Sequence, residues 1–409
     1  MSRSRRLLSV LAVSSLLGLA ACGGESTAEP DGPDAGSDVT FTGDPVTILS
    51  MAPYDNPILD RKEILEVVEA AVKKVNADGG INGSELKLVT CNEGFDPNMA
   101  ADCAREAVNR DVAAVVGGFA GNGDVILPIL EEAGIPWLGT PLISAGELTS
   151  AVSFPLSAGA AGLAGLGLQA AKDGCKTVAA PSTETGTAST GLGLLIGAGA
   201  QAGGVKEVET IRMPPNVSDY SGIAQQAQGV DCVVMAAAGN VIAGFAAANA
   251  SLGGTTKMYV MGASISQDIL DAAGPVLEGI RTWSTFPVAE DPIWDDAKAA
   301  APSVTDGGEA GWVSLINQNA WVSVVSFANF AASLDEVSSQ SVLAGLQAET
   351  AFDTLGFTEP IDFTKSFFIP DFARAFNMKA QWVTVEDGKL VPDSDEISDL
   401  GEAFASMGQ

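Results

Sequence analysis

Histidine is absent from all 409 residues of the chain. It is the usual general base at neutral pH and the commonest zinc ligand. Its absence excludes an enzyme of the Ser-His-Asp or Cys-His type. The sequence also has no nucleophile elbow, no P-loop and no clustered metal ligands. We therefore expect a protein that is not an enzyme, with no cofactor and no metal.

Basic side chains are also scarce. Lysine and arginine total 21 against 51 acidic residues, which gives a net charge of −30. Binding to phosphate groups needs clustered lysine and arginine, so this balance argues against nucleic acid as a partner. Apolar residues make up 46% of the chain. That composition and this length suit two domains with sizeable cores.

Long apolar runs are few, and the first lies at the N-terminus. Arg3, Arg5 and Arg6 precede an apolar stretch at residues 7–21, which is too short to span a bilayer and is typical of an export signal. The stretch ends in Leu-Ala-Ala-Cys at residues 19–22, which resembles the lipobox of bacterial lipoproteins. The resemblance implies a signal peptide over residues 1–21 and a lipid on Cys22, which would anchor the protein to the outer face of a bacterial membrane. An ordinary cleaved signal with a chance cysteine is the alternative.

The next segment, residues 22–44, is rich in glycine, serine, proline and acids and has no apolar period. We interpret it as a flexible tether. A second apolar run, from Cys232 to Ala248, could be mistaken for a membrane span. Gly239 and Asn240 interrupt it, so a strand followed by a helix is the better interpretation.

The remaining four cysteines lie in a chain expected in an oxidising compartment. Cys91 closes a predicted strand and Cys103 lies in the following helix, whereas Cys175 and Cys232 each stand at the entrance of a predicted strand. We favour the pairs Cys91–Cys103 and Cys175–Cys232. Four cysteines allow two other connectivities, and four free buried thiols are a further alternative.

One strand–helix–strand unit organises the first half of the chain. A short apolar strand at residues 86–90 is followed by Asp96-Pro97, an N-cap and a proline at the first helical position. A second buried strand at residues 112–116 ends in the glycine-rich loop 117–122. In open parallel sheets ligands collect at the carboxyl ends of strands, so this loop is the first candidate for a binding site.

The same alternation of strands and helices continues to about residue 266 and predicts an α/β fold with two Rossmann-like, doubly wound lobes in tandem. Each lobe should send loops from the carboxyl ends of its strands. A further long helix within residues 312–334 should cover the first lobe. A pair of short strands is expected around Asp387-Gly388.

At this point the sequence resembles a known family. Residues 76–83 (NADGGING) and the segment Cys91–Gly118, with Pro97 and Cys103, are similar to type I periplasmic binding proteins of the leucine/isoleucine/valine-binding class. The resemblance covers nearly all of residues 45–391. It implies two lobes joined by a three-crossing hinge, which close on a small polar solute and deliver it to an ABC importer permease.

On this basis we expect one lobe to comprise residues 45–153 and 287–356, and the other residues 154–286 and 357–409. The solute would be a branched-chain or other amino acid, or an amide or urea-like compound, and the protein would act as a monomer. A ligand-sensing lipoprotein that reports to a membrane signalling partner is the alternative function on the same fold.

The resemblance also points to a site, loop by loop. In relatives, two loops of the first lobe hold the α-carboxylate and amine of an amino acid. We expect free backbone N–H groups at Ala120, Gly121 and the helix start at Asp124 to favour an anionic or carbonyl oxygen. Relatives hold the ammonium with an acid near Gly239, which this chain lacks, so Glu184 could supply that charge. The expected ligand-binding residues are Tyr54, Phe119, Ala120, Gly121, Asn122, Thr140, Pro141, Leu142, Glu184, Thr185, Gly239, Asn240 and Ser264.

Several of these residues have an alternative interpretation. Asn122 and Asn240 can simply occupy left-handed turn conformations. Phe119 and Tyr54 suit packing as well as a ligand wall, and Glu184 can be a solvated loop acid.

Overall fold

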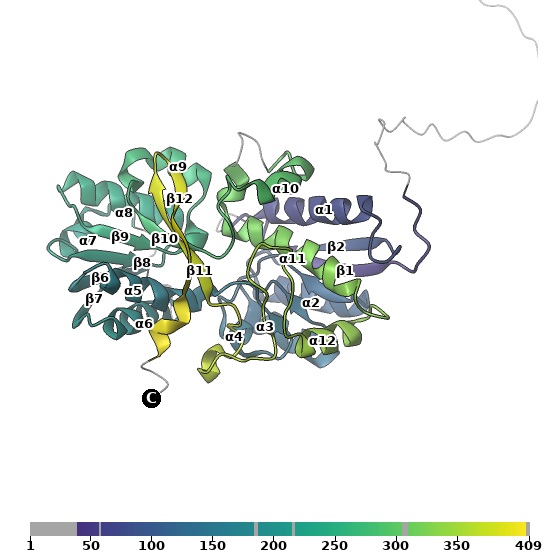
Figure 1. Ribbon diagram of the computed structural model, residues 1–409. Helices are drawn as coiled ribbons and strands as arrows, with labels where there is room; N and C mark the ends of the chain where they lie inside the picture. The colour runs from purple at the N-terminus through teal and green to yellow at the C-terminus, as the bar shows by residue number, and fades with distance from the viewer. Residues whose placement is uncertain (1–38, 57–58, 184–186, 215–216, 305–309, 406–409) are drawn as a thin grey trace, which may run out of the picture. The chain divides into compact units, whose positions relative to one another are not determined.

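The computed structural model describes residues 39–56, 59–183, 187–214, 217–304 and 310–405 (Figure 1). Two α/β lobes are built on two sheets, each formed mainly of parallel strands, which confirms the fold class expected from the sequence. No helix among these residues has both the length and the apolar character needed to cross a membrane. The signal peptide, Cys22 and most of the tether lie outside the described residues.

The first sheet has five parallel strands in the order β2-β1-β3-β4-β5. Its strands are β1 (Val46–Ala52), β2 (Leu86–Asn92), β3 (Ala114–Val116), β4 (Trp137–Leu138) and β5 (Ser153–Phe154). Because all of them run parallel, the loops that leave their carboxyl ends meet at one edge of the sheet.

Two of the helices that follow these strands show recognisable capping residues. At the start of α2, the Asp96 carboxylate accepts the N–H groups of Asn98 and Met99, and Pro97 is the first helical residue. At the end of α3, Gly134 adopts a left-handed φ of 68°. The helices of this part of the chain are α1 (Lys62–Ala77), α2 (Pro97–Asn109), α3 (Gly123–Ala133) and α4 (Ala145–Thr149).

The second sheet has seven strands in the order β12-β11-β10-β9-β8-β6-β7. Strands β6 to β10 are parallel, whereas β11 runs antiparallel to β10 and forms a hairpin with β12. Asp387 and Gly388 have φ values of 51° and 73° at the expected turn, where a tight hairpin needs positive φ. The strands are β6 (Thr177–Thr183), β7 (Glu207–Met213), β8 (Cys232–Met235), β9 (Lys257–Val260), β10 (Arg281–Ser284), β11 (Lys379–Glu386) and β12 (Lys389–Asp399).

Small residues allow two helices of the second lobe to pack unusually closely. A Cβ atom at Gly199 would overlap the carbonyl oxygen of Ala164, and one at Gly167 would overlap that of Ile196. The glycines of α5 and α6 are therefore a packing requirement. The helices that accompany this sheet are α5 (Gly162–Lys172), α6 (Thr187–Ala202), α7 (Ser221–Gln226), α8 (Gly239–Ser251) and α9 (Gln267–Ala273), and α10 (Asp295–Ala300) follows β10.

The chain then returns to the first lobe. Helix α11 (Leu315–Ala331) packs against α1 and β3, and α12 (Ser339–Ala348) follows it (Figure 1). A Cβ at Gly117 would lie 3.3 Å from Ala320, and one at Gly139 would overlap Ser323. The Asn319 side chain also donates to the Gly139 carbonyl over 2.8 Å. Helix α11 thus fixes the backbone at the ends of β3 and β4. The exact residue limits of the two lobes stay a prediction.

Both favoured disulfides are present. The Cα atoms are 5.6 Å apart in Cys91–Cys103 and 5.9 Å apart in Cys175–Cys232, within the range that a disulfide spans. The first joins β2 to α2. The second joins the segment before β6 to the start of β8, and these strands are neighbours in the sheet.

Candidate functional site

The first side of the candidate site is the carboxyl edge of the first sheet. Tyr54 follows β1, residues 119–122 follow β3, and residues 140–142 follow β4. Strand β3 pairs with both β1 and β4, so the three loops emerge side by side. The structure therefore brings together the first-lobe residues expected from the sequence.

Glu93, which directly follows β2, connects these loops. Its carboxylate accepts the Asn122 side-chain N–H over 3.1 Å and the Gly121 backbone N–H over 3.4 Å. Glu93 is fully buried, and this burial raises its pKa, although the bonds to Asn122 and Gly121 lower it. Neighbouring Asn92 likewise exchanges hydrogen bonds with the backbone N–H and carbonyl of Tyr54.

This network corrects one expectation from the sequence. The Gly121 N–H is not free, because Glu93 accepts it, and the Phe119 N–H donates to the Met51 carbonyl over 2.8 Å. Phe95 also covers the loop, since a Cβ at Gly121 would overlap its ring. The glycine-rich loop is thus held in place by bonds within the protein.

Residues 140–142 differ in how far their side chains are buried. The Thr140 hydroxyl is buried and bonds to Ser153 over 2.9 Å. Leu142 is fully buried in the hydrophobic cluster of the second lobe, at a φ of 53°. Pro141 and Phe119 are partly exposed. Of these, Pro141 and Phe119 are better placed than Thr140 and Leu142 to contact a solute with their side chains.

The same edge holds a second buried carboxyl group, Glu147 of α4. Its Oε2 accepts the N–H groups of Ile143 and Ser144 over 2.5 and 3.2 Å, and the Ser144 hydroxyl completes a capping box. Its Oε1 has no hydrogen-bond partner among the described residues and lies where a Cβ on Gly123 would overlap it. Burial raises the pKa of Glu147 to about 8, although the two N–H bonds oppose the rise.

Glu147 predicts a dependence of stability on pH. The folded protein keeps a proton on this carboxyl group that the unfolded chain releases above its ordinary pKa of 4.5. The free energy of unfolding should therefore fall as pH rises from about 4.5 to about 8. Glu147→Gln preserves the capping box but removes this titration. Over the same pH range its free energy of unfolding should therefore fall by about 1–3 kcal/mol less than that of the unaltered protein.

Chemical denaturation of both proteins across this range measures the effect. Glu132→Gln, an exposed acid at the end of α3, is the matched control and should retain the slope of the unaltered protein. An identical slope in Glu147→Gln would show that Glu147 is ionised in the folded protein.

The second side of the expected site is only partly described. Gly239 is the first residue of α8, Asn240 is exposed beside it, and Ser264 ends a short 3₁₀ helix at residues 262–264. A Cβ at Gly239 would overlap the Ser264 carbonyl, so the loops after β8 and β9 are in contact. Glu184 and Thr185 lie outside the described residues.

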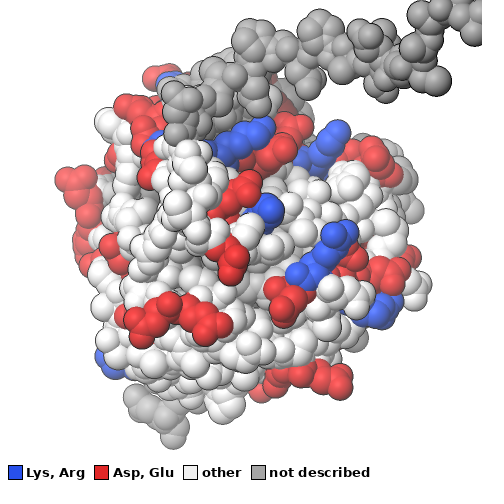
Figure 2. Space-filling model, turned by 90° about the vertical axis from the view of Figure 1, so that its right-hand side faces the viewer, with Lys and Arg blue, Asp and Glu red and all other residues white. Residues whose placement is uncertain are grey.

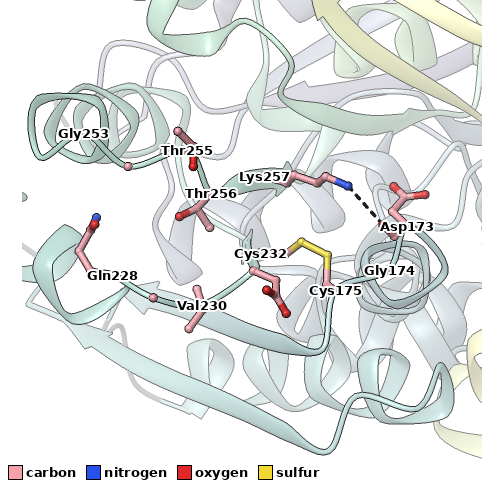
Figure 3. Close-up of a pocket in the computed structure, with 13 residues that line it drawn as sticks. Asp173, Gly174, Cys175, Gln228, Val230, Cys232, Gly253, Thr255, Thr256 and Lys257 are labelled. Atoms are coloured by element: carbon pink, nitrogen blue, oxygen red, sulfur yellow. Dashed lines mark hydrogen bonds between the residues drawn. A yellow bond between two sulfur atoms is a disulfide. The ribbon is translucent and has the colours of Figure 1, made fainter.

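Several cavities lie away from these loops, and three of them border the second sheet. One of about 460 Å³ is lined by Asp173, Lys257 and the Cys175–Cys232 disulfide, at the amino ends of the strands (Figure 3). Another of the same size shares Asp173 and contains Arg281. A third, of about 280 Å³, lies where β10 and β11 meet the connecting segments, near Pro287 and Asn377. None of the three is lined by an expected ligand-binding residue.

Sequence reasoning missed Glu93 and Glu147. The available signal for Glu93 was its position, an acid directly after a strand of the same sheet edge. For Glu147 the signal was Ser144 three residues before it, which is the spacing of a capping box. Neither signal shows which N–H groups the carboxylates accept.

Comparison with known proteins agrees with this architecture. The model of a family described as periplasmic binding protein matches residues 61–388. A short segment is 35% identical over 83 residues to the Leu/Ile/Val-binding protein of Escherichia coli K12, covering 20% of this chain and 22% of that protein. The chain thus aligns with less than a quarter of the length of this curated relative.

Solved structures match over most of the chain. An extracellular ligand-binding receptor from Verminephrobacter eiseniae has a TM-score of 0.72 at 17% identity, covering 85% of this chain and 99% of that one. A fatty acid ABC transporter substrate-binding protein from Thermomonospora curvata has a TM-score of 0.71 at 18% identity, covering 90% and 97%. At this identity the matches establish the fold. Because the family model spans most of the sequence, the chain belongs to the periplasmic binding protein family and is a binding protein, not an enzyme.

Proposed function

We propose that this protein captures a small polar solute between its two lobes and delivers it to an ABC importer. The observation that carries the proposal is the shared carboxyl edge of the first sheet, where the loops after β1, β3 and β4 meet, combined with membership of a solute-binding family. Domain closure over such an edge buries a ligand and supplies affinity. Solved neighbours include a putative branched-chain amino acid ABC transporter protein from Rhodospirillum rubrum, besides the fatty acid binder.

The proposal includes a location and a site. The export signal and Cys22 would place a lipid-anchored monomer on the outer face of a bacterial membrane, with the permease as its partner. The solute would contact Tyr54, Phe119, Ala120 and Pro141 on the first lobe, with Asn122 nearby. On the second lobe it would meet Glu184, Thr185, Gly239, Asn240 and Ser264.

A ligand screen tests this function. Amino acids, their amides and urea-like solutes would be added to the full chain and the melting temperature recorded. A bound solute at about a hundred times its dissociation constant should stabilise the protein by about 2.7 kcal/mol. Conversion of any of these solutes into another compound by the protein would contradict the proposal, because a transport receptor releases its ligand unchanged.

Glu184 provides a prediction about the second lobe. If it meets an amine or amide of the solute, Glu184→Gln should weaken binding of an amine ligand by roughly 1–3 kcal/mol, because a charge-assisted hydrogen bond is lost. Calorimetry measures the change. Glu207→Gln, an exposed acid that begins β7, is the control and should leave the affinity unchanged. Equal affinities for the Glu184 variant and the unaltered protein would remove Glu184 from the site but leave the cleft in place.

A further inference from the structure

Phe95, in the loop after β2, adopts an unusual backbone conformation for a bulky residue. Its φ of 52° lies in the left-handed region, where a side chain of this size raises the conformational energy. The side chain is also 40% exposed, so burial offsets only part of that cost. Strained residues of this kind cluster at ligand-binding sites, where the surrounding structure holds them in place.

Hydrogen bonds of the neighbouring backbone hold this loop. The Gly94 N–H donates to the Asn92 side chain over 2.9 Å, and the Gly94 carbonyl accepts the Asn56 side-chain N–H over 2.5 Å. Two residues after Phe95, Pro97 begins α2. The backbone on both sides of Phe95 is therefore tied to other elements, so the fold sets the position of this residue.

The ring of Phe95 lies against the backbone of the glycine-rich loop. A Cβ at Gly121 would lie 2.2 Å from Cε2 of that ring, so only glycine fits beside it without a shift. Gly121 is one of the expected ligand-binding residues. Tyr54 and Phe119 leave the neighbouring strands β1 and β3 at the same edge, and both are partly exposed. Three successive strands therefore each place an aromatic side chain at the candidate site.

The aromatic clusters of the protein do not include these three rings. The clusters join other residues, for example Phe154 and Phe363. Within the part of the chain that the structure describes, Tyr54, Phe95 and Phe119 take part in no aromatic pair and no cation–π contact. An aromatic partner for these rings would therefore have to come from outside those residues.

The loops at this edge also lack basic side chains. Residues 52–60, 93–99, 117–123 and 139–146 contain no lysine or arginine. By contrast, Figure 2 shows a face of the molecule on which basic side chains lie among acidic ones. The loops around Phe95 therefore offer a solute aromatic contact area but no basic side chain.

We propose that Phe95 is a solute-contacting residue, and that it selects a small polar solute that also carries an aromatic ring. Aromatic rings favour edge-to-face and offset-stacked contacts, which an exposed ring in a held position can offer. The proposal rests on the proposed function, because it names the chemical class of solute for the same site. It adds the loop after β2 to an edge whose expected contacts came from the loops after β1, β3 and β4.

Two pairs of probes that differ by one phenyl group test the proposal: L-phenylalanine with L-alanine, and phenylacetamide with acetamide. Calorimetry on the full chain would measure their binding. The aromatic member of at least one pair should bind, and more tightly than its partner. Phe95→Ala should weaken binding of that aromatic probe by about threefold to tenfold, because a ring contact is lost, and should leave its partner unaffected.

Three further variants separate contact from structure. Phe95→Tyr keeps the ring and should keep the preference for the aromatic probe, whereas Phe95→Leu keeps apolar bulk and should lose most of it. Phe368→Ala removes another exposed phenylalanine, which pairs with Phe367 in the segment before β11, and should bind as the unaltered protein does.

Two results would overturn the proposal. One is that neither aromatic probe binds. The other is that Phe95→Ala weakens both members of a pair equally, which would show that Phe95 only supports the loop. Capture of a non-aromatic solute in the ligand screen would leave the proposed function standing in either case.

Discussion

Replacing Arg374 by alanine should destabilise the protein by about 2–4 kcal/mol, one of the largest effects expected of a single substitution in this chain. Arg374 lies in the segment that precedes β11, and its side chain contacts β5 of the first sheet. Its Nε donates to the Ser153 carbonyl over 2.7 Å, and its guanidinium lies over the rings of Phe154 and Phe376, 4.6 and 4.4 Å from their centroids. Burial lowers the pKa of Arg374 to about 10, so it stays charged at neutral pH.

Two further variants separate shape from charge. Arg374→Lys keeps the charge but loses the flat group that contacts both rings, so it should recover less than half of the lost free energy of unfolding. Arg105→Ala removes an exposed arginine that pairs with Asp102 on α2 and should change stability by less than about 0.5 kcal/mol. Chemical denaturation measures all three. Equal stabilities for Arg374→Ala and Arg105→Ala would mean that the stacked guanidinium contributes nothing.

Removing the Cys175–Cys232 disulfide should cost about 4 kcal/mol, and removing Cys91–Cys103 about 3 kcal/mol. The reason is the length of the closed loop. The two pairs are 57 and 12 residues apart in sequence, and a longer loop restricts the unfolded chain more strongly. Alanine at both positions of a pair avoids leaving a free thiol.

Denaturation of the two double variants under oxidising conditions gives the comparison. Under reducing conditions the unaltered protein should lose stability, whereas a variant lacking both disulfides should not respond. A Cys91/Cys103 variant less stable than the Cys175/Cys232 variant would contradict the loop-length argument. It would indicate that the packing of α2 on β2 contributes more than restriction of the unfolded chain.

The packing of α11 bears on how the glycine-rich loop works. Ala320 and Ser323 of this helix lie directly against Gly117 and Gly139, and Asn319 donates to the Gly139 carbonyl. The ends of β3 and β4 are therefore held by direct contacts with α11. An edge held in one conformation lowers the entropic cost of binding.

The sequence by itself determined the alternation of strands and helices, the turn at Asp387-Gly388 and the start of α2 at Asp96-Pro97. These features depend on local chemistry, because apolar periodicity, proline and glycine act within a few residues of where they stand. The same pattern predicted where each strand ends. This prediction put Tyr54, Phe119 and Thr140 at the carboxyl edge of the first sheet, where the structure also has them.

Only the tertiary structure decided which groups at that edge are available. Glu93 and Gly121 are 28 residues apart, and Arg374 and Ser153 are 221 residues apart. No periodicity pairs such residues, since their contact depends on how strands β2 and β3 flank β1 and on where the chain returns after α12. The sequence therefore placed these loops at one edge of the sheet but left a donor at Gly121 free, because a hydrogen bond between two distant loops is a property of the packed molecule.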